Sequence, residues 1–243
     1  MTSSVRRSAL ITGATGGLGR EICLKLAADG WDIYVGWHRS EDIAKAVCAE
    51  LTALGIQART LKLDMNDAPA ISGAVDFDPV SPVEVLVINA ARLPQVAPLG
   101  QVSLEEVREQ FNVSALGPFE LIRSVWRRHF KPRGKGHLIV ISTAGVALPP
   151  APRMAGYIIG KAALEAVAAC ATSEFGPGGL ATTVIRPTYM DTPLLRAFEN
   201  RYVEFMRERN CVIPPAQVAL VVAAAANNPP VAGEYNCREA KGN

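Results

Sequence analysis

Several features that mark large classes of protein are missing from this chain of 243 residues. No run of about 18 apolar residues occurs, the length that predicts a membrane-spanning helix, so we expect no membrane association. The five cysteines are scattered, and none stands in the close pairs that bind a metal ion. We therefore expect no metal site and a reducing, cytoplasmic setting. Cys23 and Cys170 lie in apolar helical stretches, where we expect them to be buried.

An excess of charge of one sign is also missing. The formal net charge is +2, which argues against nucleic acid as a partner. Residues 1–7 lead into an apolar strand rather than a cleavable apolar segment, so we expect no secretion signal. Hydrophobic residues make up 49% of the chain, enough for a large core. Because no repeat or linker interrupts the pattern, we expect residues 1–243 to form a single domain.

Apolar runs of strand length alternate with helical patterns along the chain. The expected strands are Ser8–Thr12, Asp32–Gly36, Arg59–Leu63, Val83–Ile88, His137–Ile141, Ala181–Arg186 and Val231–Asn236. The expected helices are Gly17–Asp29, Glu41–Leu54, Ser103–Phe130, Gly156–Glu174 and Pro215–Ala226. Several strands are rich in β-branched residues, as strands buried on both faces require. The alternation predicts an α/β fold: a Rossmann-type doubly wound parallel sheet of about seven strands with helices on both faces.

A glycine-rich turn, Thr12-Gly-Ala-Thr-Gly-Gly-Leu-Gly19, follows the first expected strand. Gly13 allows a sharp turn, and Gly17 and Gly19 remove side chains where backbone must approach a pyrophosphate or a neighbouring strand. The amides and the dipole at the start of the next helix favour an anion. A turn that binds no ligand is the alternative, but the strand–turn–helix context favours a dinucleotide site.

Tyr157 and Lys161 are four residues apart in an expected helix, so their side chains face the same way. We expect the ammonium to lower the pKa of the phenol from its ordinary value of about 10. Such a phenol can exchange a proton with a substrate oxygen near neutral pH. This spacing also arises by chance, so the pair carries weight only together with the glycine turn.

These motifs together resemble the short-chain dehydrogenase/reductase family over about Ala9 to Thr192. The glycine turn is similar to the family's TGxxxGxG, and Tyr157 with Lys161 to its YxxxK pair. The other matching positions are Asp64, Asn89-Ala90-Ala91 (the family's NNAG), Asn112, Ser142, and Pro187 with Thr192 (its PGxxxT segment). The resemblance implies an NAD(P)-dependent oxidoreductase, most similar to 3-oxoacyl-acyl-carrier-protein reductases.

The resemblance also implies roles. Ser142 would donate a hydrogen bond to the reacting oxygen, and Tyr157 would deliver the proton. Lys161 would lower the pKa of the phenol and bind the nicotinamide ribose, while Asn112 would hold a water that links Lys161 to solvent. The cofactor-binding residues would be Gly13, Thr15, Gly16, Gly17, Leu18, Gly19, Arg39, Ser40, Asp64, Met65, Asn89, Ala90, Tyr157, Lys161, Pro187 and Thr192.

Simpler interpretations of these residues stay open. Ser142 can bond its own loop, with Thr143 as a less favoured stand-in, and Asp64 can merely begin a turn. Asn112 can be a satisfied polar residue in a helix. Ser142 and Tyr157 are fifteen residues apart, which predicts an enlarged loop at Leu148–Arg153 on the substrate side.

The segment after the second expected strand favours NADP(H) over NAD(H). An acid there would bind the ribose 2′-hydroxyl of NAD, but none occurs before Glu41. Arg39 can bind a 2′-phosphate through two hydrogen bonds, and Ser40 can add another while it caps the next helix. A surface arginine with dual cofactor use is the alternative, and Gly16 counts against NADP because many NADP-using relatives carry a basic residue in the turn.

The segment 188–212 is the expected substrate lid. Its apolar residues recur at near-helical spacing, at Leu194, Leu195, Phe198, Tyr202, Phe205 and Met206. Packing on the core alone is the alternative. Basic residues gather in two clusters: Arg196, Arg201, Arg207 and Arg209; and Arg123, Arg127, Arg128, Lys131, Arg133 and Lys135. They are either solvated charged faces or a docking surface for an acidic acyl-carrier protein.

We therefore expect NADPH-dependent reduction of a ketone to a secondary alcohol, first of all of a 3-oxoacyl thioester on an acyl carrier. A free-standing carbonyl reductase or secondary-alcohol dehydrogenase for a small lipophilic compound is the alternative. A dinucleotide-sensing protein without turnover is a third. Small apolar residues surround the expected helix 156–174, so we also expect a homodimer or homotetramer.

Overall fold

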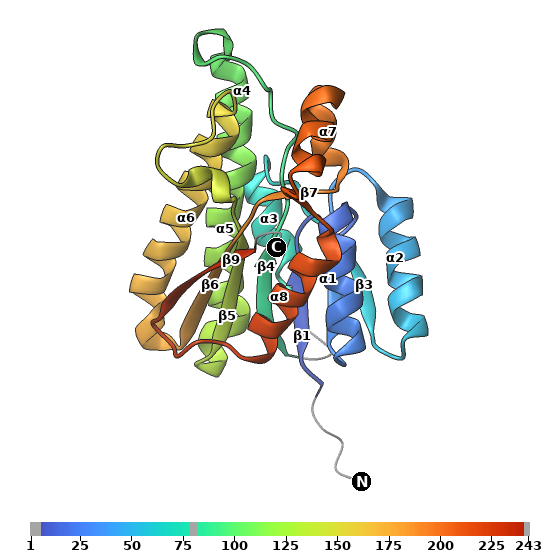
Figure 1. Ribbon diagram of the computed structural model, residues 1–243. Coiled ribbons are helices and arrows are strands. Elements are labelled where there is room, and N and C mark those ends of the chain that lie inside the picture. The colour runs from blue at the N-terminus through green and yellow to red at the C-terminus, as the bar shows by residue number, and fades with distance from the viewer. Residues whose placement is uncertain (1–5, 78–81, 241–243) are drawn as a thin grey trace.

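A computed structural model describes residues 6–77 and 82–240 (Figure 1). A seven-stranded, wholly parallel sheet forms its centre, in the order β3-β2-β1-β4-β5-β6-β9. Its strands are β1 Ser8–Ile11, β2 Asp32–Trp37, β3 Ala58–Lys62, β4 Val83–Ile88, β5 Gly136–Ile141, β6 Leu180–Pro187 and β9 Tyr235–Ala240. The predicted doubly wound parallel sheet is confirmed.

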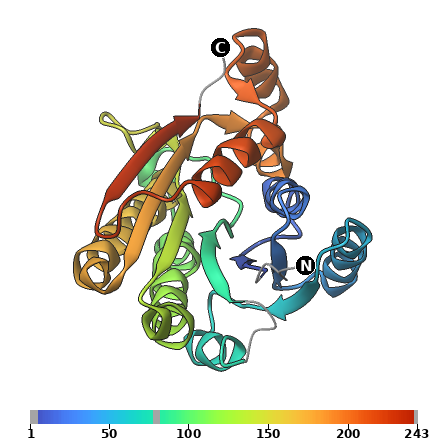
Figure 2. The same cartoon turned by 90° about the horizontal axis from the view of Figure 1, so that it is seen from below.

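Helices cover both faces of the sheet, as the view along its layers shows (Figure 2). One face carries α1 (Gly17–Ala28), α2 (Glu41–Ala53) and α8 (Pro215–Asn227). The other carries α3 (Ala68–Ala74), α5 (Gly117–Val125) and α6 (Ala155–Phe175). Alternate residues of the central strands feed the two cores, so these strands are apolar throughout.

Strand order reverses at β1, which pairs with β2 on one side and β4 on the other. The connections from these strands leave in opposite directions, which opens a crevice beyond their carboxyl ends. The glycine turn follows β1 there, and Asn89 follows β4. This crevice is where the fold gathers the predicted site residues.

The predicted long helix Ser103–Phe130 is continuous but not uniform. It consists of α4 (Leu104–Phe111), a π-helical turn (Asn112–Leu116), α5 and a second π-helical turn (Trp126–Phe130). The Ser103 hydroxyl caps it by accepting a hydrogen bond from the Glu106 amide at 3.1 Å. The Glu106 carboxylate, however, accepts from the Gln95 amide at 3.0 Å and so anchors a neighbouring loop.

Three parts of the secondary structure differ from prediction. The last strand is β9, Tyr235–Ala240, rather than Val231–Asn236, because the chain first turns at Gly233 (φ +85°). The short helix α3 was not expected, although the Asp67 side chain caps it at 3.1 Å. The segment after β6 forms β7 (Tyr189–Met190), α7 (Asn200–Glu208) and β8 (Val212–Ile213).

Helix α6 runs through the domain against the sheet. With the turn that follows it, Ala155–Gly178 is long and apolar enough to cross a membrane by length and composition alone. Here the helix packs on one core and buries Lys161, as a core helix of a globular domain does. Cys23 is buried as expected, but Cys170 is exposed because it lies on the outer face of α6.

Candidate active site

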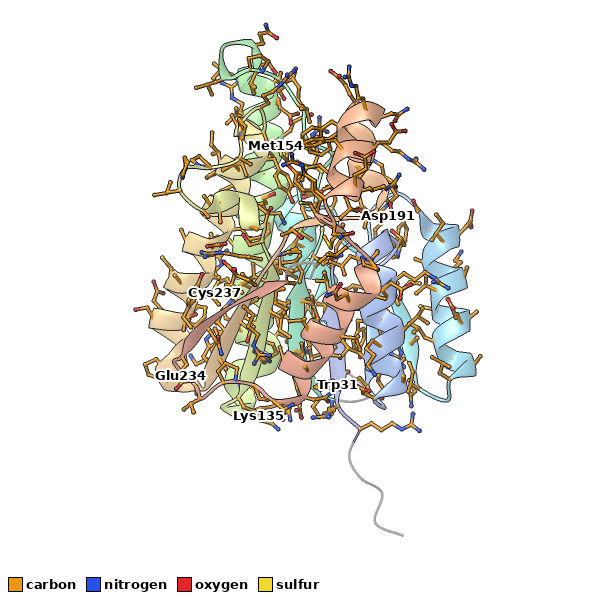
Figure 3. The ribbon with its side chains drawn as sticks, in the orientation of Figure 1. Trp31, Lys135, Met154, Asp191, Glu234 and Cys237 are labelled. Atoms are coloured by element: carbon orange, nitrogen blue, oxygen red, sulfur yellow. The ribbon has the colours of Figure 1, made fainter. Side chains whose placement is uncertain are left out.

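A cleft of about 860 Å³ opens at the carboxyl ends of the central strands. It lies at the end of the molecule that carries Met154 and Asp191, opposite the end that carries Trp31 and Lys135 (Figure 3). The predicted residues that line it are Gly13, Thr15, Gly16, Gly17, Leu18, Gly19, Arg39, Asp64, Met65, Asn89, Ala90, Ser142, Tyr157, Lys161 and Thr192.

The glycine turn is fixed to the end of β4. The Thr12 hydroxyl accepts hydrogen bonds from the Asn89 and Ala90 amides, both at 2.9 Å. Gly13 has φ +62°, and a Cβ there would lie 2.9 Å from the Ala90 Cα. A Cβ on Gly19 would lie 2.2 Å from the Gly13 carbonyl oxygen. Both glycines are therefore required by close backbone approach.

The start of α1 fits an anion. Its N-cap is Gly16, and no side chain of the described residues caps the first turn, so its amides stay available. A Cβ on Gly17 would lie 3.3 Å from the Thr192 methyl group, so Thr192 faces the turn across the cleft. These amides and this open space suit the pyrophosphate of a dinucleotide.

The end of the cleft beyond β2 and β3 carries ionisable groups. His38 Nε2 lies 3.0 Å from the Asp64 carboxylate, which also accepts from the Asn66 amide at 2.9 Å. Burial works to raise the pKa of Asp64, but the Asn66 hydrogen bond and the nearby His38 outweigh it and hold the pKa low. Arg39 lines the cleft and makes no ion pair among the described residues. Sequence analysis missed His38, although it directly follows β2.

Tyr157 is only 8% exposed, and it packs in a small apolar cluster with Met154 and Ile158, against Leu194 and Phe198. Burial raises the pKa of Tyr157 to about 12. The expectation that Lys161 lowers this pKa is therefore wrong for the protein alone. The cause is the apolar enclosure of the ring, which disfavours the phenolate.

Lys161 lies one helical turn beyond Tyr157. Its ammonium is 5.8 Å from the centre of the Tyr157 ring and donates a hydrogen bond to the Ile141 carbonyl at 2.7 Å. Burial lowers the pKa of Lys161 to about 8, and the Glu165 carboxylate opposes this shift. The lysine is thus near the point where it loses its charge under mildly alkaline conditions.

Ser142 follows β5 and lines the cleft, and its amide bonds the Ile185 carbonyl at 2.8 Å. Its hydroxyl is buried, and no described group meets it with full hydrogen-bond geometry. Thr143 instead uses its hydroxyl to accept from the Gly145 amide at 3.2 Å, inside its own turn. Ser142, rather than Thr143, therefore holds an unused donor at the site.

Three predicted residues do not line the cleft. Asn112 begins the first π-helical turn and is half-buried, whereas the next residue, Val113, reaches the cleft. Pro187 is buried at the end of β6. Ser40 is the N-cap of α2 by position, but its side chain makes no capping hydrogen bond, so the expected cap is absent.

The predicted loop Leu148–Arg153 also lies outside the cleft lining. The loop is largely exposed, with Leu148 90% exposed. The backbone carbonyl of Arg153 accepts a hydrogen bond from the Ala97 amide. Most of the extra length therefore lies at the surface, although Ala151 packs against the apolar cluster around Tyr157.

The expected lid contributes little of its apolar stripe to the cleft. Leu194 lines the cleft together with Met190 and Pro193. The rings of Tyr189, Phe198 and Tyr202 contact one another, edge to face at Tyr189 and stacked between Phe198 and Tyr202, with ring centres 5.5 to 6.1 Å apart. Leu194 and Phe198 also pack against the apolar cluster around Tyr157, whereas Tyr202 and Phe205 are exposed, so packing on the core alone does not describe this stripe.

The basic cluster after α5 lies at the far end of the molecule, where Lys135 marks it in Figure 3. Most of its members are paired with acids: Arg133 and Lys135 with Glu84 at 2.9 and 3.1 Å, and Arg128 with Asp76 at 2.9 Å. The solvated, paired face is therefore the better interpretation of this cluster.

One polar group at the substrate end escaped the sequence analysis. Arg92 follows Ala91 and forms ion pairs with Glu109 and, at 3.5 Å, with Glu106. All three line the cleft. No motif marks them, because residues of α4 meet Arg92 only after folding.

The fold and this cleft define the class of the protein, a Rossmann-type α/β oxidoreductase. A family model described as short chain dehydrogenase matches residues 7–202. The uncharacterized oxidoreductase YohF of Escherichia coli is 28% identical over 188 residues, which cover 76% of this chain and 74% of the relative. The 3-oxoacyl-[acyl-carrier-protein] reductase FabG of Staphylococcus epidermidis is 25% identical over 207 residues, 84% of each chain.

Solved structures agree. A short chain dehydrogenase from Burkholderia cenocepacia, in complex with NADP, is 25% identical with a TM-score of 0.82 over 97% of both chains. A blue fluorescent protein from a metagenomic library, in complex with NADPH, is 26% identical with a TM-score of 0.84, over 100% of this chain and 98% of that one. The chain belongs to the short-chain dehydrogenase family.

Proposed function

We propose that the protein is an NADP(H)-dependent reductase that converts a ketone to a secondary alcohol. The observation that carries this proposal is the arrangement of one cleft. This cleft contains the open anion-binding start of α1. It also contains three buried groups: the Tyr157 phenol, the Lys161 ammonium and the unpartnered Ser142 hydroxyl. Bound in the cleft, a reduced nicotinamide would supply the hydride.

The side chains of the cleft stabilise the developing charge and supply the proton. The Ser142 hydroxyl donates a hydrogen bond to the carbonyl oxygen, where negative charge develops. Tyr157 delivers the proton to that oxygen, and its raised pKa of about 12 keeps the proton available at neutral pH. Lys161 is charged below its pKa of about 8 and stabilises the phenolate left after proton transfer.

NADP(H) is the proposed cofactor because of the charges beyond β2. Arg39 is free to meet a 2′-phosphate, and Glu41 is held by Lys45 at 2.8 Å, on α2. The Burkholderia cenocepacia relative in complex with NADP supports the same choice. Comparison of NADPH with NADH at subsaturating concentrations tests it directly.

The first substrate we propose is a 3-oxoacyl thioester, which fits the apolar side chains of Met190 and Leu194 and the likeness to FabG. A carrier protein would have to meet the basic residues around α7. Arg196 and Arg201 there are exposed and make no ion pair among the described residues.

A free lipophilic ketone is the second candidate, and one observation favours it. The basic cluster around Lys135 lies at the end of the molecule away from the cleft, so it cannot help a carrier present its substrate there. Oxidation of NADPH should be compared with a 3-oxoacyl carrier thioester, the same acyl group on a short thiol, and free ketones. Turnover of the carrier thioester supports the first substrate, and turnover of ketones alone supports the second.

We further propose that the protein is a homodimer or homotetramer. Large apolar side chains stay exposed on the outer face of α4 to α6, at Phe111, Leu116, Phe119 and Ile159. Small residues of α6, such as Ala162 and Ala166, lie exposed on the same outer side of that helix. A second copy of the chain would cover this face.

A further inference from the structure

The catalytic stripe of α6 continues past Lys161. Its successive members are four positions apart and lie on one side of the helix: Tyr157, Lys161 and Glu165. Glu165 has only 12% of its side chain exposed, although ionised carboxylates are seldom buried without a partner. An acid at this depth, one turn from the lysine of the site, requires an explanation.

Arg186 is the partner of Glu165. Its Nε donates to one carboxylate oxygen at 2.8 Å, and its terminal nitrogen donates to the other at 2.5 Å. Arg186 follows Ile185, which pairs with Ile141 across the sheet. The forked contact fixes the position of the carboxylate.

The sheet places Ser142 on the same face. Val140 and Val184 point into the core beneath α6, so Ser142 and Arg186, two residues further along each strand, point to α6 as well. Glu165 therefore lies between the end of β5, the end of β6 and the lysine of the site.

The charge of Glu165 is maintained by these neighbours. Burial works to raise its pKa, but the hydrogen bonds from Arg186 and the charges of Arg186 and Lys161 outweigh it and hold the pKa low. In return the carboxylate opposes the effect of burial on the pKa of Lys161. No direct ion pair joins the two groups among the described residues, so the effect acts through space.

Two other titratable groups approach from the edge strand β9. Tyr235 and Cys237 have raised pKa values, mainly because of burial and with the Glu165 charge as a further cause. Cys237 is marked on β9 in Figure 3. Both are neutral at pH 7, so Glu165 supplies the negative charge that acts on Lys161 from this side.

We propose that Glu165, clamped by Arg186, is a positioning residue that keeps the ammonium of Lys161 charged at the working pH. It touches neither substrate nor cofactor and acts through Lys161. The consequence for turnover rests on the proposed reductase function, whereas the effect on Lys161 itself does not.

The effect on Lys161 is measured without turnover. In protein labelled with ¹³C at the lysine ε carbons, the Lys161 resonance is assigned with the Lys161→Arg variant and titrated with pH. Glu165→Gln should lower the pKa of Lys161 by about one unit. Glu174→Gln, the same change at an exposed site of α6, is the matched control and should leave it unchanged.

A second variant distinguishes the loss of the carboxylate charge from a folding defect. Glu165→Leu combined with Arg186→Leu removes the carboxylate without leaving a guanidinium unpaired, and it should lower the pKa of Lys161 as well. An unchanged Lys161 pKa in either folded variant overturns the proposal.

The pH profile then gives the consequence for the reaction. The alkaline limb of kcat/KM for ketone reduction should move to lower pH in Glu165→Gln, and Glu165→Asp, which keeps the charge, should restore it in part. A uniform loss of rate with an unmoved limb would mean a merely structural role and would refute the positioning role. If the wild-type protein reduces no carbonyl, the reductase function fails while the titration still decides the effect on Lys161.

Discussion

At the scale of single residues, burial sets the direction of the pKa shift at three groups. Tyr157, Lys161 and His137 are all shifted toward their neutral forms by desolvation. Sequence reasoning identified the first two from their spacing but expected the charge of Lys161 to dominate the phenol. The enclosure of Tyr157 by side chains from the distant lid segment is a tertiary effect that spacing does not reveal.

The proposed preference for NADP(H) rests on Arg39, which lines the cleft. Arg39→Ala should raise KM for NADPH by 10-fold or more, about the worth of a charge-assisted hydrogen bond to phosphate, and leave KM for NADH nearly unchanged. Arg59→Ala, at an exposed arginine of β3, is the control. Equal effects on both cofactors in steady-state kinetics would contradict a 2′-phosphate contact.

His137 makes stability depend on pH. It is 3% exposed, its Nε2 lies 2.9 Å from the Thr183 hydroxyl, and burial lowers its pKa to about 4. Between about pH 6.5 and pH 4 the unfolded chain binds a proton at His137 that the folded chain does not bind. Stability is therefore lost as the pH falls through this range. Denaturant unfolding should give a free energy of unfolding about 2 kcal/mol lower at pH 5 than at pH 7 from this group.

The His137→Gln variant isolates that contribution. It cannot titrate, so its stability should change less between the two pH values than that of the wild type. Identical changes in both proteins would assign the pH dependence to other groups.

At the scale of elements, local patterns were the ones that sequence alone revealed. The glycine turn and the first six strands depend on neighbours in sequence, and each was predicted. The two π-helical turns, the true start of β9 and the burial pattern of the lid depend on packing partners far along the chain. The pairing of Glu84 with Arg133 and Lys135 likewise appears only when β4 and β5 lie side by side.

The turn between β1 and α1 has no room for an added methyl group at Gly19. Gly19→Ala should abolish NADPH binding or folding, because its Cβ would lie 2.2 Å from the Gly13 carbonyl oxygen, which is backbone and cannot rotate away. Gly73→Ala, in α3 with nothing within 4 Å, should be neutral or stabilising. Fluorescence titration with NADPH and thermal unfolding check both, and normal binding by Gly19→Ala would refute the assigned role of the turn.

At the scale of the whole molecule, the proposed subunit interface is the outer face of α4 to α6, where large apolar side chains are exposed. Phe119→Glu should convert the proposed oligomer to a smaller species in analytical ultracentrifugation, because a charge would be buried in the interface. Leu54→Glu is the matched control, since Leu54 is 52% exposed and Phe119 51%, but it follows α2 on the other side of the sheet. A wild-type monomer, or equal effects of the two variants, would contradict an interface at α4 to α6.

The proposed reaction depends on Tyr157, which would deliver a proton to a carbonyl oxygen in this cleft. The most direct measurement compares NADPH oxidation with a reducible ketone or thioester by the wild type, by Tyr157→Phe and by the control Tyr235→Phe, with NADPH binding measured alongside. Tyr157→Phe should lose about 100-fold or more of the rate while it binds NADPH as the wild type does. Reduction by Tyr157→Phe at the wild-type rate would contradict this role.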